Sequence, residues 1–82
     1  MNNYFVNTAS DEIQNQYSKE NSAGNGIGIG EADQTIEEAI EAEGWTLGES
    51  FADSLATAHD ASGNRYIVGG DGSRRNAWAV SA

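Results

Sequence analysis

The chain has 82 residues, a formal net charge of −9 at pH 7 and no cysteine. A chain of this length forms a small core, so we expect a single domain over residues 1–82 and no large catalytic cleft. Without cysteine, disulfide bonds and thiolate metal sites are excluded. The negative charge disfavours nucleic acid and anionic membranes as direct partners and favours a basic protein surface.

The sequence supplies few large apolar side chains and no recognisable targeting signal. Of its 31 apolar residues, 12 are alanine, which leaves 19 larger side chains for a core. Residues 1–6 lack the basic and apolar stretches of a signal peptide, and no segment approaches the roughly 20 apolar residues of a membrane span. We therefore expect a soluble protein of the cytoplasm.

The N-terminal third gives mixed structural signals. The apolar side chains at positions 4–6 predict a short strand. Ser10 can cap a helix that carries Ile13 and Tyr17 four residues apart, but the polar residues between and after them are weak helix formers. Residues 7–25 are therefore predicted to be either a short helix or a mobile loop.

A strand and an amphipathic helix are predicted next. Alternating isoleucine and glycine favour a strand over residues 27–31. Asp33 is the expected N-cap of a helix over residues 34–43, which ends at Gly44. This helix has a narrow apolar face, which we expect to be buried against a sheet and which consists of Ile36, Ala39 and Ile40.

The C-terminal half predicts antiparallel strands joined by turns. Trp45 and Leu47 begin a run of β signals, and the connecting segments have the composition of hairpin turns. The expected order is a strand at 51–59, a turn at 60–64, a strand at 65–68, a turn at 69–73 and a strand at 77–81. A helix over residues 50–58 is the alternative, because the alanines there favour a helix.

Together these elements predict an α+β fold, with a small antiparallel sheet of four to five strands and one acidic helix packed on one face. Trp45 and Trp78 are expected in the core, because a chain so short of large apolar residues can hardly leave its two largest side chains outside.

No residue pattern in the chain identifies an enzyme. His59 is the single histidine and has no neighbours at a spacing that is typical of a catalytic site. The glycine run at 24–30 lacks the last glycine of a dinucleotide fingerprint and the lysine of a phosphate-binding loop. The loops at 60–64 and 71–73 lack the alternating carboxylates and final glutamate of a calcium loop. We therefore expect a binding protein without catalytic activity, cofactor or metal.

The most informative feature is a block of acidic residues without any basic residue. Residues 31–60 contain nine Asp and Glu side chains and no Lys or Arg. Like charges at helical spacing cost roughly a few tenths of a kcal/mol per pair, and glutamates near a helix C-terminus oppose the helix dipole. Either the charge keeps the protein soluble, or it recognises a basic partner through the candidate residues Glu31, Asp33, Glu37, Glu38, Glu41 and Glu43.

In this combination the chain resembles small acidic phage proteins that inhibit host defences, above all anti-CRISPR proteins, with DNA-mimicking anti-restriction proteins as a neighbouring class. The resemblance rests on the opening segment 1–6, the acidic helix at 35–43, the compact α+β layout and the lack of an enzyme signature. It implies a stoichiometric inhibitor that docks through its acidic surface on a CRISPR effector complex in the host cytoplasm and blocks target-DNA recognition. A basic patch departs from DNA mimicry and consists of Arg65, Arg74 and Arg75.

Two other classes of function require different surfaces. A small accessory or regulatory module would dock through an exposed aromatic patch of Trp45, Tyr66 and Trp78. A small enzyme or ligand carrier would need a pocket of about 300 Å³ around His59. The positions of the aromatic side chains and of any pocket therefore discriminate between these classes.

Overall fold

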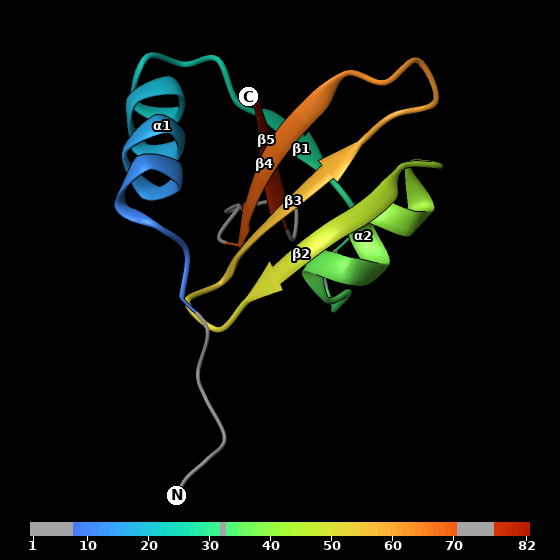
Figure 1. Ribbon diagram of the computed structural model, residues 1–82. Coiled ribbons are helices and arrows are strands. Elements are labelled where there is room, and N and C mark those ends of the chain that lie inside the picture. Colours follow the sequence, from blue (N-terminus) through green and yellow to red (C-terminus); the bar gives the residue numbers. More distant parts are fainter. Residues whose placement is uncertain (1–7, 32, 71–76) are drawn as a thin grey trace, which may run out of the picture.

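The computed structural model describes residues 8–31, 33–70 and 77–82 (Figure 1). Its elements are, in chain order, helix α1 (Asp11–Ser22), strand β1 (Ile27–Ile29), helix α2 (Ile36–Ala42) and strands β2 (Thr46–Phe51), β3 (Leu55–His59), β4 (Arg65–Gly70) and β5 (Ala77–Ser81). The strands form one sheet in the order β1-β5-β4-β3-β2, and every neighbouring pair is antiparallel. The predicted α+β fold with a small antiparallel sheet is confirmed.

The two helices cover opposite faces of the sheet (Figure 1). Val68 of β4 lies in the cluster under α2, whereas its neighbour Ile67 lies in the cluster under α1. Adjacent residues contribute to different clusters because successive side chains of a strand point to opposite faces. Ile40 joins the first cluster from α2, and Tyr17 packs against the second from α1. The sheet is therefore the middle layer of three, because α1, one of the two alternatives predicted for residues 7–25, covers the second face.

Helix α1 resolves the ambiguity of the N-terminal third. Its N-cap is Ser10, whose hydroxyl accepts a hydrogen bond from the backbone N–H of Ile13 at 3.2 Å. The weak helix formers in this segment are tolerated because Ile13 and Tyr17 pack against the apolar cluster on the sheet. The mobile-loop alternative is therefore wrong for the described part of residues 7–25, and the strand predicted at 4–6 lies outside the described residues.

The N-cap predicted for α2 is wrong. Thr35 caps the helix in place of Asp33. The Thr35 hydroxyl accepts from the backbone N–H of Glu38 at 3.0 Å, and the Glu38 carboxylate accepts from the backbone N–H of Thr35 at 2.8 Å. This reciprocal capping box satisfies two backbone N–H groups at the start of the helix. Thr35 is therefore the N-cap, and Asp33 is not. Asp33 precedes it with a positive φ of 77°, and Gly44 follows the helix as predicted, with φ 80°.

The strand predicted over residues 51–59 is divided by a turn. Ser54 has a positive φ of 64°, and its carbonyl accepts a hydrogen bond from the N–H of Gly70 at 3.1 Å. The segments on either side pair with each other as the β2–β3 hairpin. The alternating pattern of residue types in the sequence continues through this turn, so the prediction treated residues 51–59 as one strand. The helix considered for residues 50–58 is wrong.

Other boundaries differ by a few residues. Strand β1 ends at Ile29, and β4 continues to Gly70 into the segment that was predicted as a turn. The remainder of that predicted turn lies outside the described residues, as do two members of the predicted basic patch, Arg74 and Arg75. The turn at 60–64 and the last strand at 77–81 are confirmed.

Small side chains let α2 lie close to the sheet. The buried cluster beneath it has eight members, of which five are alanine: Ala39, Ala56, Ala58, Ala77 and Ala79. At Gly30 even a methyl group has no room, because a Cβ built there would lie 2.5 Å from the Cβ of Ala39. Gly30 also has a positive φ of 77°, which glycine adopts without strain.

Replacing Ile40 by alanine is expected to cost about 2 to 5 kcal/mol, enough to unfold much of so small a domain. Ile40 is fully buried between α2 and the sheet, at 0% exposure. Thermal unfolding followed by circular dichroism measures the loss. Ile27→Ala is the matched control, because that side chain is 54% exposed and should tolerate truncation. An unchanged melting temperature for Ile40→Ala would contradict the packing of α2.

A second prediction separates steric contact from backbone strain. Gly30→Ala should lower the free energy of unfolding by about 1 to 2 kcal/mol because alanine is strained in a left-handed backbone conformation. Overlap of the new methyl group with α2 should lower it by about 1 to 3 kcal/mol more. Gly24→Ala should lose only the first amount, because Gly24 also has a positive φ, of 83°, but nothing lies within 4 Å of its added Cβ. Urea unfolding measures both variants. Equal losses would show that α2 does not press on Gly30.

Candidate binding surface on helix α2 and strand β2

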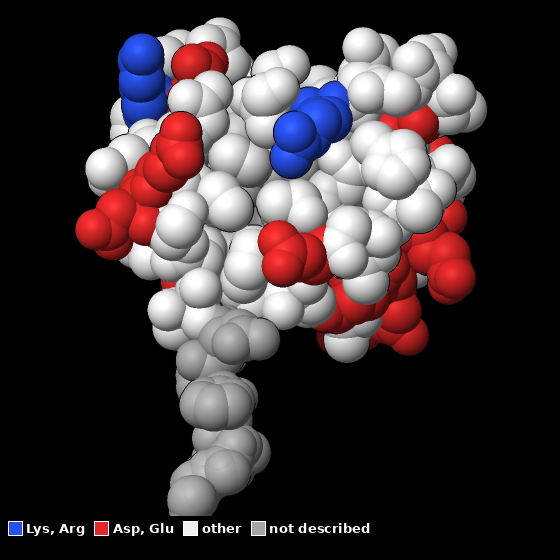
Figure 2. Space-filling model, in the orientation of Figure 1, with Lys and Arg blue, Asp and Glu red and all other residues white. Residues whose placement is uncertain are grey.

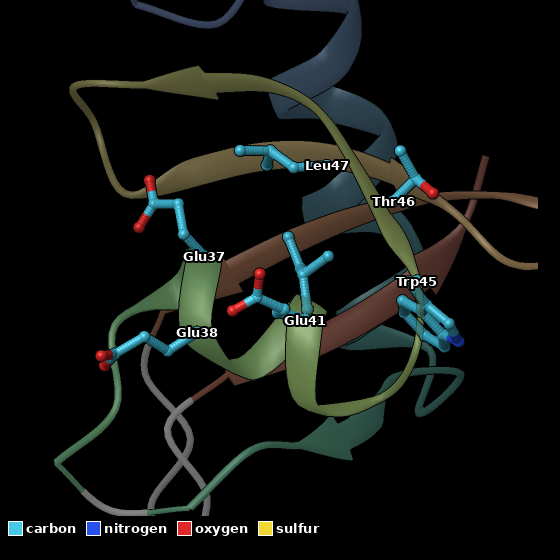
Figure 3. Close-up of a pocket in the computed structure, with 7 residues that line it drawn as sticks. Glu37, Glu38, Glu41, Trp45, Thr46 and Leu47 are labelled. Atoms are coloured by element: carbon cyan, nitrogen blue, oxygen red, sulfur yellow. The ribbon is translucent and has the colours of Figure 1, made fainter.

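A groove of 350 Å³ runs between α2 and the start of β2 (Figure 3). It is lined by Glu37, Glu38, Ile40, Glu41, Trp45, Thr46 and Leu47. The groove follows from the narrow apolar face of α2, because turning Ala39 and Ile40 onto the sheet brings the adjacent glutamates to its edges. Figure 3 shows Glu37 extending towards β2 and Glu38 pointing away from the strand, with the Glu41 carboxylate turned towards the Glu37 side of the helix.

An irregularity in β2 completes the groove. The register of β2 against β3 shifts between Leu47 and Ser50, with Leu47 opposite Ala58 and Ser50 opposite Ala56. Residues three apart on a regular strand point to opposite faces, whereas a bulge inserts one residue and puts both on the same face. Leu47 therefore lines the groove, and Ser50 reaches the helix.

The groove combines an apolar floor with an aromatic end. Leu47 is 38% exposed and is one of two large apolar side chains exposed among the described residues. Trp45 is half-buried, and its ring stacks on Tyr66 with the centroids 4.2 Å apart and the planes 7° from parallel. The stacking holds the indole in one orientation at the end of the groove.

Two of the acidic side chains at the rim have fixed positions. The Ser50 hydroxyl donates a hydrogen bond to the Glu37 carboxylate, and this bond lowers the pKa of Glu37 below its ordinary value. Glu38 is held by the capping box with Thr35. The Thr-x-x-Glu spacing could have identified the role of Glu38, but no sequence signal links Glu37 with a residue thirteen positions away.

The structure brings four of the six predicted site residues together. Glu37, Glu38 and Glu41 line the groove, and Asp33 joins Glu38 and Glu41 around a shallow depression of 440 Å³ on the outer side of the helix. We call Asp33, Glu37, Glu38 and Glu41 the acidic surface. Glu31 and Glu43 are exposed but line neither hollow. Figure 2 shows acidic side chains gathered over the part of the molecule where α2 lies, and a separate group over α1.

The acidic surface has no counter-charge within the described part of the chain. The basic side chains described are Lys19 on α1 and Arg65 at the start of β4, and neither forms an ion pair with the six predicted carboxylates. Glu41 makes no side-chain hydrogen bond to another described residue. Within residues 8–31, 33–70 and 77–82, no basic side chain pairs with its carboxylate.

Other members of the acidic block serve the fold. The Asp53 carboxylate accepts from the backbone N–H of Ala9 at 3.3 Å and so holds the residues just before α1 against the β2–β3 turn. The Asp60 carboxylate accepts from the side chain of Asn64 and from the N–H groups of Ser62 and Asn64, and these bonds lower its pKa. The sequence prediction counted both among the nine acidic residues of positions 31–60 but did not include them in the six candidate binding residues.

The aromatic residues do not form one patch. Trp45 and Tyr66 stack on the side of the sheet that α2 covers. Trp78 points to the other face, because it is two residues from Val80, which lies in the cluster under α1. Both tryptophans are half-buried, so the expectation that they lie in the core holds only in part. His59 is exposed at the end of β3 and does not line the groove.

The described ranges contain neither a metal-binding cluster nor a membrane-spanning helix. No three His, Asp or Glu side chains there are grouped to hold a metal ion, and neither helix is long and apolar enough to cross a bilayer. Comparison of the chain with protein-family models, with curated proteins and with solved structures finds no match. Function is therefore inferred from the surface itself.

The Glu37–Ser50 hydrogen bond predicts a pH effect. Ser50→Ala should raise the pKa of Glu37 towards its ordinary value of 4.5, which carboxyl chemical shifts in an NMR titration measure directly. Because the folded-state pKa is lowered, the bond stabilises the protein above the unfolded pKa, and this contribution is lost as the pH falls through the folded pKa. Ser62→Ala, in a distant turn, is the control. An unchanged Glu37 titration in Ser50→Ala would disprove the bond.

Proposed function

We propose that this chain is a non-catalytic inhibitor that binds a basic surface of another protein through its acidic surface. The observation that supports this proposal is the exposure of four carboxylates around one short helix, with no ion pair to a described basic residue. Unpaired carboxylates of one sign produce a field that steers a basic partner and speeds association.

The placement of charge along α2 argues against stability as its purpose. Glu37 and Glu38 in the first turn suit the helix dipole, but Glu41 lies in the last turn, which contains no basic residue, and Glu43 lies at the C-cap. Lysine or arginine at these positions would stabilise the helix. A binding role explains why acidic residues stand there.

The partner we propose is the positively charged DNA-binding path of a CRISPR effector complex in the host cytoplasm. Such a path holds nucleic-acid backbone through basic side chains rather than through base sequence. Glu37 and Glu41 are one helical turn apart, about 6 Å along the axis, and so present charges at a spacing that basic side chains built for phosphates can engage. The proposed action is stoichiometric blocking of target-DNA recognition by DNA mimicry.

Reversing two carboxylates without a partner among the described residues tests the binding role; Glu41 belongs to the acidic surface, and Glu43 lies at the adjacent C-cap of α2. Glu41→Lys combined with Glu43→Lys should preserve or improve stability, because it favours the helix dipole, while it lowers the affinity for the partner and weakens the salt dependence of binding. Calorimetry of the partner complex at two salt concentrations measures both effects.

The control is Glu12→Lys combined with Glu20→Lys on α1, which changes the net charge by the same amount on the opposite face of the sheet. Because it removes the hydrogen bond from Asn25 to Glu20, amide spectra first check that this variant is folded. Equal losses of affinity in the two double variants would mean that net charge alone determines binding. If the affinity changed neither with salt concentration nor in the Glu41→Lys, Glu43→Lys variant, the acidic residues would serve solubility and not binding.

Titration against a purified effector complex tests the proposed inhibition. Target-DNA capture in a gel-shift assay should fall to a minimum near one molecule of this chain per effector, and the α2 double reversal should restore capture. Saturation near one equivalent is expected because a blocker must occupy each DNA path. Inhibition at far below one equivalent would indicate turnover and would contradict the proposal.

A further inference from the structure

We propose that the groove between α2 and β2 receives an arginine side chain projecting from the basic surface of the partner. The inference rests on the proposed function and deepens it, because it identifies the kind of side chain that anchors the complex. Its basis is the combination of an apolar floor, an acidic rim and an aromatic end in one hollow.

The floor and the rim match the two halves of an arginine side chain. Leu47 and the base of the groove offer apolar contact for an aliphatic stem, and Glu37 and Glu41 line the groove from the helix (Figure 3). Long basic side chains lay their stems along apolar surface while their charged ends stay with polar partners. Ile27, the other large exposed apolar side chain described, lies on β1 at the opposite edge of the sheet.

Arginine fits this groove better than lysine does. A guanidinium group is planar and carries several N–H donors, so it can bond two carboxylates at once, whereas an ammonium is a compact charge. Glu37 is held by Ser50 and presents a carboxylate in a set orientation. Trp45, which Tyr66 holds by stacking, offers an aromatic surface for the guanidinium at the end of the groove.

Charge complementarity selects the occupant. The lining includes three glutamates and no basic residue, and no described Lys or Arg of the chain pairs with them. An apolar or acidic segment would leave these carboxylates desolvated without partners, which is unfavourable. A surface that binds DNA phosphates is rich in arginine, so the proposed partner supplies the required side chain.

Peptide binding followed by NMR tests the groove directly. The probes are three peptides of equal length. In each, serine alternates with one other residue, which is arginine, lysine or uncharged citrulline. The arginine peptide should shift the indole N–H signal of Trp45 in a saturable way and bind about fivefold more tightly than the lysine peptide, since bidentate bonding and stacking are lost with lysine. The citrulline peptide should not saturate.

Leu47→Ser removes the apolar floor and leaves every charge in place. This substitution should lower the affinity for the arginine peptide about tenfold, because the aliphatic stem of the arginine loses its apolar contact. Ile27→Ser removes the other exposed apolar side chain and should bind as the unaltered protein does. Amide spectra confirm that both variants are folded. Equal affinity for arginine and lysine peptides, or no effect of Leu47→Ser, would overturn the groove as an arginine site.

The groove and the proposed function can fail separately. If the unaltered chain does not inhibit DNA capture by the effector but binds the arginine peptide selectively in the groove, the groove stands and the effector is the wrong partner. If the chain inhibits the effector but no arginine-selective shift of Trp45 occurs, the acidic surface acts without the groove and the inference is overturned.

Discussion

The close approach of α2 to an alanine-rich face of the sheet determines most of what this molecule presents to its surroundings. A seven-residue helix gains little stability from its own hydrogen bonds, so it depends on burying Ala39 and Ile40 completely. The alanines of β3 and β5 and the bare backbone of Gly30 provide the space. Because only this narrow stripe is buried, the rest of the helix surface remains for charged side chains.

The acidic residues then fall into two groups with different purposes. Asp53 and Asp60 organise turns, and Glu38 caps the helix, so their charges are bound up with the fold. Glu37 belongs to both groups, since Ser50 fixes its carboxylate at the rim of the groove. Glu41 has no described partner. It is the residue whose charge is hardest to explain without a binding role.

Much of the fold was predictable from the sequence because local signals agreed with the final packing. The helix at 34–43 and the strands at 65–68 and 77–81 were found from spacing, and Gly44 was correctly placed as the end of its helix. Helix α1 was uncertain because its stability comes from contacts of Ile13 and Tyr17 with distant strands. The turn at Ser54 was missed because alternation runs through it.

The candidate site was only partly predictable. The acidic residues of α2 were identified from charge alone, but charge does not reveal which carboxylates are held by the fold. The groove depends on the shift of register in β2 that turns both Leu47 and Ser50 towards the helix. Without that bulge one of them would face α1, as the period of two in a strand requires. Gly48 lies within this shift, and an isolated glycine in a strand is a signal of a bulge that the sequence prediction did not use.

Exchange of backbone hydrogens in the complex tests most directly whether α2 and the start of β2 form the binding surface. The exchange rates of the chain alone would be compared with those of the chain saturated with a CRISPR effector complex. Binding through the acidic surface predicts slower exchange over residues 36–47 and unchanged exchange over α1, on the opposite face of the sheet. Protection confined to α1, with residues 36–47 unaffected, would contradict it.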